Sequence, residues 1–280
     1  MSWREIAILL ALIWLLACAV CFGAGRKANP EVHSVVWMET ERGGILLGGS
    51  MAGRWLPAAR LARRLRGGER YRLYSDHAYL REAVGTKPYD AGMNPFFVDL
   101  RPGDERCSIA IAGSWNAMPR KAKTQSIIQK IYIAAARDVL RRHGLRRAPV
   151  HIKKVLRVDL EGDGRDEVLI AAESQDYEHV WYKKGQYSLV ILRKLVKGNI
   201  RTFLLGGDFH VRGTPAPKPR EDAPDWPVGY DVDGFWDVDG DGALEIAVHW
   251  SCQLADAGGE KVFNIKSGKP RLLADAGVRL

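Results

Sequence analysis

The stretch Val155–Ile170, VLRVDLEGDGRDEVLI, places a run of carboxylates and glycines between two apolar segments. The apolar ends predict two strands, and the acidic centre predicts the loop that joins them. A second stretch, Gly234–Val248, has the same form and reads GFWDVDGDGALEIAV. The repetition predicts two copies of one strand–loop–strand unit in the C-terminal half of the chain.

The two acidic loops share one spacing, with acids at positions 1, 3, 5 and 9 and glycines at positions 4 and 6. Alternate residues of a tight loop can turn their carboxylates inward together. Such oxygens suit Ca²⁺, which takes roughly six to eight oxygen ligands, and position 7 would add a backbone carbonyl. The predicted metal ligands are Asp159, Glu161, Asp163, Arg165 and Glu167 in the first loop, and Asp237, Asp239, Asp241, Ala243 and Glu245 in the second.

Two alternatives compete with a calcium loop of this kind. An EF-hand needs an acidic ligand at position 12 and flanking helices, but Ile170 and Val248 stand there and the flanks predict strands. The second alternative is a pair of metal-free Asp/Gly turns held by Asx hydrogen bonds. The tetrapeptide Asp231–Gly234 resembles the start of another loop, but Phe235 occupies its position 5, so we interpret it as a turn.

With their flanking strands, DLEGDGRDEVLI and DVDGDGALEIAV resemble the calcium loops of FG-GAP or VCBS-type repeats, the family of integrin-α-like β-propellers. The resemblance implies that each loop lies in a hairpin of a propeller blade and that the cation stabilises the blade. It covers the C-terminal half of the chain at most. Glu161 departs from the usual Asp or Asn, and two loops are too few for a complete propeller, so the resemblance implies antiparallel hairpins resembling partial blades.

The fold class predicted for the whole chain is mainly β with one long helix (α+β). The apolar stripe of Lys121–His143 predicts that helix, and Gly144 ends it. Residues 75–106 hold many turn formers and predict an irregular excursion with short strands. The Pro-rich segment Gly213–Gly229 predicts a linker or surface loop. We expect three regions: residues 1–25, an α+β region at 26–148, and a β-rich region at 149–280.

The N-terminal segment Ile6–Gly23 carries no charge and is followed by small residues, which predicts an export signal. Two variants stay open, because the segment is also close to the length of a membrane anchor. Leu15–Cys18 resembles a bacterial lipobox, in which Cys18 would be lipidated. The expected location is therefore periplasmic, cell-surface or secreted. Outside this segment, Cys107 and Cys252 could form a disulfide or remain two buried thiols.

The formal charge of +9 bears on the partners. Solvated helix faces rich in Arg are the favoured interpretation of this charge. If it binds an anion in an exported protein, lipid head groups or acidic polysaccharides are expected before nucleic acid. The sequence contains no GxSxG, HExxH or P-loop pattern, and its histidines are scattered. The primary expectation is a calcium-binding structural module that binds another protein or a polysaccharide. The alternative is a secreted carbohydrate-active hydrolase on the same scaffold, and exposed tryptophans would favour it.

Overall fold

The computed structural model describes residues 32–40, 43–90, 92, 95–174, 183–212, 227–252, 257–266 and 268–278. The predicted export segment at residues 1–25, with Cys18, lies outside these residues, as does most of the Pro-rich segment. The chain from Val32 onward forms one compact unit. No helix in the described part of the chain has the length and apolarity needed to cross a membrane.

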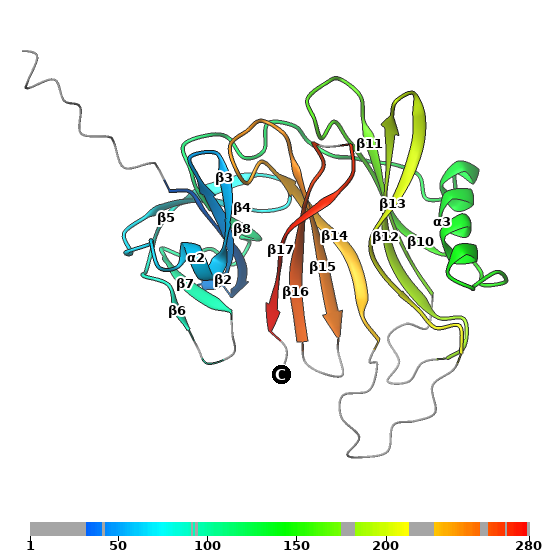
Figure 1. Ribbon diagram of the computed structural model, residues 1–280, viewed down its shortest axis with the longest axis horizontal. Helices are drawn as coiled ribbons and strands as arrows, with labels where there is room; N and C mark the ends of the chain where they lie inside the picture. The colour runs from blue at the N-terminus through cyan, green and yellow to red at the C-terminus, as the bar shows by residue number, and fades with distance from the viewer. Residues whose placement is uncertain are drawn as a thin grey trace, which may run out of the picture. The chain divides into compact units, whose positions relative to one another are not determined.

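The N-terminal part of this unit is a closed antiparallel barrel (Figure 1). Its strands follow one another in the order β2-β1-β8-β4-β5-β7, and β7 pairs with β2 to close the ring. Short strands β3 and β6 extend the sheet, and a single helical turn, α2, follows β3. The elements are β1 (Ser34–Thr40), β2 (Gly43–Met51), β3 (Arg54–Pro57), α2 (Ala58–Leu61), β4 (Arg70–Tyr74), β5 (Tyr79–Gly85), β6 (Tyr89–Asp90), β7 (Phe96–Arg101) and β8 (Ile109–Ala112).

Alternation along the barrel strands separates two apolar faces. One set of side chains, including Val36, Leu46 and Leu73, fills the barrel core. The alternate residues Val35 and Ile111 belong to a second cluster, which packs against the neighbouring sheet. The barrel is therefore apolar inside and on one outer side.

Two antiparallel sheets follow the barrel, and in each the strands are neighbours in chain order. We call β9–β13 the outer sheet and β14–β17 the inner sheet. The inner sheet lies between the barrel and the outer sheet (Figure 1). The strands are β9 (Lys123–Thr124), β10 (Ile152–Val158), β11 (Glu167–Glu173), β12 (Tyr187–Val196), β13 (Asn199–Phe209), β14 (Gly229–Trp236), β15 (Glu245–Cys252), β16 (Ala257–Asn264) and β17 (Arg271–Val278).

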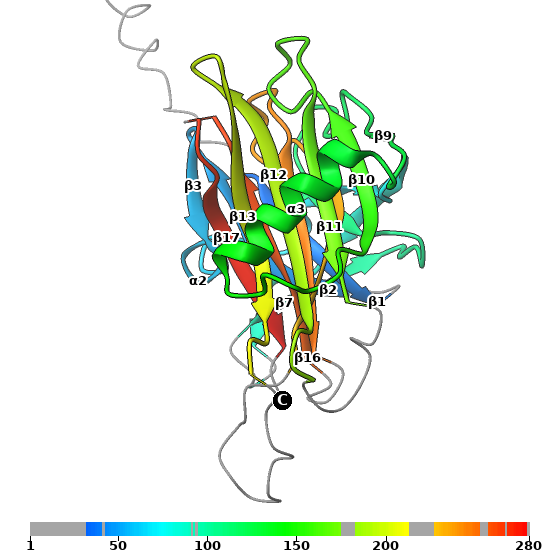
Figure 2. The same ribbon diagram turned by 90° about the vertical axis from the view of Figure 1, so that its right-hand side faces the viewer.

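A single helix of more than one turn, α3 (Lys130–Arg142), occurs among the described residues, and it packs on the outer sheet (Figure 2). The prediction of one long helix from Lys121 is wrong in its length, because Lys123–Thr124 pair with β10 as β9. The mainly β, antiparallel prediction is confirmed. The helix packs against C-terminal strands, through partners such as Ile170 and Leu189.

Two further expectations are settled by the described residues. Asp231–Gly234 is not a turn, since these residues lie inside β14, where a bulge falls between Val232 and Gly234. Cys107 and Cys252 are both buried and free, so they do not form a disulfide.

Candidate metal centre

The two acidic loops join neighbouring strands at the same end of the two sheets (Figure 1). The first loop, residues 159–166, connects β10 to β11, and the second, residues 237–244, connects β14 to β15. The loops touch, because the Leu244 amide donates a hydrogen bond of 2.8 Å to the Leu160 carbonyl oxygen. This arrangement places both predicted sites at the junction of the outer and inner sheets.

Both loops fold around the carboxylate of their first residue. In the second loop, Asp237 accepts hydrogen bonds from the amides at positions 4, 5 and 6, which are Gly240 (2.7 Å), Asp241 (3.1 Å) and Gly242 (2.9 Å). Asp159 accepts the equivalent three bonds in the first loop, at the same distances. The repeat read from the sequence is therefore a repeat of backbone structure. These are also the Asx hydrogen bonds of the metal-free alternative.

The second loop gathers carboxylates that are largely withdrawn from water. Carboxylate oxygens of Asp237, Asp239 and Glu245 lie within 4.8 Å of one another, so this cluster could hold a metal ion. Glu245 is 1 % exposed. Burial, together with the charges of Asp239 and Asp241, raises the pKa of Glu245 to about 9. Burial and the Asp241 charge raise the pKa of Asp239 to about 6.

Part of this cluster is satisfied by the protein itself. Glu245 accepts a hydrogen bond from the Val238 amide (3.0 Å) and another from the side-chain amide of Asn264 (2.8 Å). The buried Oδ1 of Asp239 has no hydrogen-bond partner among the described residues. A buried oxygen without a donor is costly, and a cation would satisfy it. The donor set is therefore suited to a hard metal ion.

The remaining predicted ligands lie at the rim of the second loop. Asp241 forms an ion pair with Lys266, whose side chain is 44 % exposed. The Asp241 carboxylate also accepts a hydrogen bond of 3.0 Å from the amide of Ala243, the residue expected to offer a carbonyl. Because Lys266 approaches from the solvent side, its ammonium can move away without leaving a buried charge.

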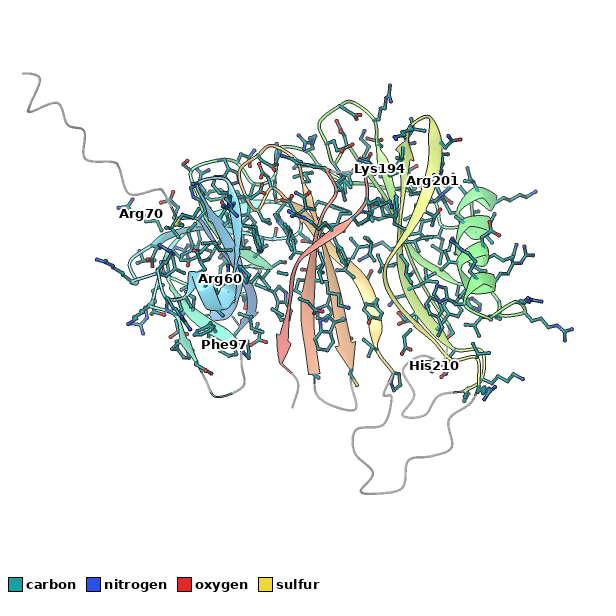
Figure 3. The ribbon with its side chains drawn as sticks, in the orientation of Figure 1. Arg60, Arg70, Phe97, Lys194, Arg201 and His210 are labelled. Carbon is teal, nitrogen blue, oxygen red and sulfur yellow. The ribbon has the colours of Figure 1, made fainter. Side chains whose placement is uncertain are left out.

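The first loop holds its own cation. The Lys194 side chain, 3 % exposed, forms ion pairs with Glu161 and with Glu167, the latter at 3.7 Å. Figure 3 shows Lys194 near the end of the sheets that carries the loops. Burial raises the pKa of Glu167, while the Lys194 ammonium acts in the opposite direction. The other predicted ligands of this loop, Asp163 and Arg165, are exposed.

Lys194 and Asn264 occupy equivalent places in the two hairpins. Val168 pairs with Arg193 across β11 and β12, which sets Glu167 opposite Lys194. In the same way, Ile246 pairs with Phe263, which sets Glu245 opposite Asn264. The same position therefore supplies a positive charge to one acidic loop and a neutral amide to the other.

Arg120 was not singled out from the sequence, yet it joins the two loops. Its guanidinium donates to the carbonyl oxygens of Asp159 (2.6 Å), Leu160 (3.1 Å) and Gly242 (2.7 Å). The Trp115 indole also donates, at 2.7 Å, to the Asp237 carbonyl. No local pattern around Arg120 signals this role, because all three acceptors are main-chain atoms distant in sequence.

A cavity of about 390 Å³ lies beside this junction. Its lining includes Arg120 and two carboxyl groups, those of Asp76 and Asp233. Burial, with the charge of Asp76 nearby, raises the pKa of Asp233 to about 6. The tryptophans give less support to sugar binding, because those the structure describes are all buried or half-buried: Trp37, Trp55, Trp115, Trp236 and Trp250.

Comparison of the chain with known proteins found no matching family model, no matching curated protein and no matching solved structure. The resemblance to FG-GAP and VCBS repeats therefore stays a prediction.

Proposed function

We propose that this protein is an exported structural or binding module in which one Ca²⁺ ion, held by the second acidic loop, fixes the junction of the two sheets. The observation that carries the proposal is the contrast between the two hairpins. Lys194 compensates the carboxylates of the first loop from a buried position. The second loop has Asn264 there instead, and the cation that the protein brings to it, Lys266, lies at the rim and pairs with Asp241. The cluster of Asp237, Asp239 and Glu245 could therefore take a metal ion.

The predicted ligands of this ion are the carboxylates of Asp237, Asp239, Asp241 and Glu245, with the carbonyl of Ala243. All of these are oxygen donors, and a set rich in carboxylates favours Ca²⁺ among the common hard cations. The proposal assigns no ion to Asp159, Glu161, Asp163, Arg165 and Glu167, because the Lys194 ammonium supplies the positive charge in that loop.

Calcium would act here by holding backbone in place. The second loop contacts the first through the Leu244 amide and contacts Arg120 through Gly242. An ion in this loop would therefore stabilise the β14–β15 hairpin and its attachment to the outer sheet. We interpret the two antiparallel sheets as partial propeller blades that present a rigid surface to a protein or polysaccharide partner outside the cell.

The proposal is tested by melting the protein in chelator and in roughly 10 mM calcium. Extracellular calcium modules bind with dissociation constants of about 10⁻⁴–10⁻³ M. Mass action then predicts about 1.4–2.7 kcal/mol of added stability, or roughly 3–10 °C in Tm for a chain of this size. Asp241→Asn should abolish the calcium shift, and Asp163→Asn, the same change at the equivalent position of the first loop, should keep it. Identical melting curves with and without calcium would refute the proposal.

The cavity lined by Asp76 and Asp233 favours a second candidate function, a glycoside hydrolase. A carboxyl group with a pKa of about 6 can act as a general acid near neutral pH, with a second carboxylate as its partner. Turnover of chromogenic glycosides that Asp233→Asn abolishes, with the calcium shift in Tm retained, would support this candidate. Absence of turnover across a panel of glycosides would count against it.

A further inference from the structure

The helix α3 lies on the outer side of the outer sheet, and none of the described residues covers its other face (Figure 2). Buried positions such as Tyr132, Ala136 and Val139 point to the sheet. The exposed positions recur at the helical spacing of three and four residues, so they form one continuous stripe. These positions are Lys130, Ile131, Ala134, Arg137, Asp138, Arg141 and Arg142.

This stripe belongs to a strongly cationic surface. Between Lys121 and Arg147 the one acidic residue is Asp138, which forms an ion pair of 3.7 Å with Arg141. A cavity of about 840 Å³ follows at the C-terminal end of α3, and none of its described lining residues is acidic. The exposed basic residues of α3 and the segment after it are Lys130, Arg137, Arg141, Arg142, Arg146 and Arg147, and the cavity adds Lys183, Lys184 and Arg212.

The same surface exposes large aliphatic side chains. Ile127 and Ile128, in the turn before α3, are 43 % and 78 % exposed, and Ile131, in its first turn, is 53 % exposed. Leu195 and Ile200 face each other across β12 and β13, and both are exposed. Leu195 lies four residues from Ile191, whose side chain packs in the cluster beneath α3, so the pair is on the α3 side of the outer sheet.

A single exposed isoleucine needs no explanation, but several on one cationic face do. Phosphates and acidic sugars would be attracted to the arginines, yet they offer nothing apolar to the isoleucines. The interface of an anionic bilayer offers both a negative surface and an apolar layer directly beneath it. Helices that lie on membranes combine basic and aliphatic side chains in this way.

We propose that the α3 face docks on the surface of an anionic lipid bilayer. Ile127, Ile128 and Ile131 enter the head-group region, and the arginines of α3 contact the lipid phosphates. This proposal is independent of the calcium site, which lies at the loop end of the two sheets.

Hydroxyl-radical footprinting of the full chain tests the docking, because it reports on this face even if the N-terminal segment also binds lipid. Vesicles that contain phosphatidylglycerol should lower the oxidation of Ile127, Ile128 and Ile131 at least threefold. Vesicles of phosphatidylcholine alone should not. Leu80 and Tyr79, on the barrel, should be oxidised equally in all samples.

Charge-reversed variants supply the matched control. Arg137→Glu with Arg141→Glu should abolish the protection of the isoleucines. Arg63→Glu with Arg64→Glu makes the same change in net charge at exposed barrel positions and should keep it. Protection that survives the α3 reversal, or none with anionic vesicles, would overturn the proposal. Protection by an acidic polysaccharide and not by vesicles would identify that partner instead.

Discussion

Replacing Lys194 by asparagine should turn the first acidic loop into a second calcium site. The change copies Asn264 into the equivalent place and leaves Glu161 and Glu167 without their ammonium. Removing one partner of a buried ion pair costs about 3–5 kcal/mol. Because the Glu161 side chain is 28 % exposed, water can partly replace the ammonium, and we expect the lower end of this range, about 3 kcal/mol, without calcium.

Calcium should return most of that loss. At about one hundred times the dissociation constant, an ion that binds the folded state alone adds roughly 2.7 kcal/mol. In chelator the Tm of Lys194→Asn should therefore fall by roughly 6–12 °C, and saturating calcium should restore most of this fall. Isothermal titration should count two ions for each chain of the variant and one for the unchanged protein.

A second substitution tests the contribution of the side-chain amide. Lys194→Met removes the ammonium but supplies no N–H group to hold Glu167, as Asn264 holds Glu245, so calcium should restore a smaller part of its Tm than that of Lys194→Asn. The reasoning is refuted if Lys194→Asn still binds one ion, or if its Tm in chelator equals that of the unchanged protein.

Three further changes test other parts of the structure. Both carboxylate oxygens of the buried Glu260 lack a hydrogen-bond partner among the described residues, and burial raises its pKa well above the usual value. A carboxyl group with a raised pKa in the folded protein lowers stability as pH rises above its usual pKa of about 4.5. Glu260→Gln should therefore be more stable than the unchanged protein at pH 8, and its Tm should vary less from pH 5 to 8. Equal Tm profiles would count against this. Arg120→Met removes three charge-assisted hydrogen bonds to the loops. It should lower the free energy of unfolding, measured in urea titrations, by about 2–4 kcal/mol. If Arg120→Lys were as stable as the unchanged protein, the guanidinium geometry would be unimportant. Gly240→Ala should destabilise the protein by about 1–2 kcal/mol more than Gly242→Ala. Both glycines have a positive φ, but only a Cβ at position 240 would meet the Trp115 ring, at 2.9 Å. Equal shifts in Tm for the two variants would contradict this.

The sequence predicted the parts of the fold that depend on local pattern. The two loops connect neighbouring strands as expected, because their acids and glycines act within one hairpin. The predicted start of the helix, at Lys121, was wrong, because the pairing of β9 with β10 overrides the helical pattern there. Asp231–Gly234 has the composition of a turn but lies in β14, where the Trp236 ring stacks close against the Gly234 backbone.

Features that depend on long-range pairing were beyond the sequence. The barrel closes through β2 and β7, far apart in the chain, and residues 75–106 gave only the expectation of short strands in an irregular excursion. In the sequence, Lys194 has the pattern of an ordinary strand residue. Its place opposite Glu167 depends on the register of β11 with β12, which the sequence does not show. The candidate metal ligands were thus predictable as residues, but the contrast between the two loops was not.

Arg120 binds the two loops through hydrogen bonds to main-chain carbonyl oxygens. These hydrogen bonds therefore do not depend on which side chains the loops carry. This makes the junction a natural place for protein engineering, because a different ligand set, such as one chosen for a luminescent lanthanide, can be grafted into either loop without removing the clamp. The two loops already differ in this way, because Lys194 compensates the acids of one and Asn264 donates to a buried acid of the other.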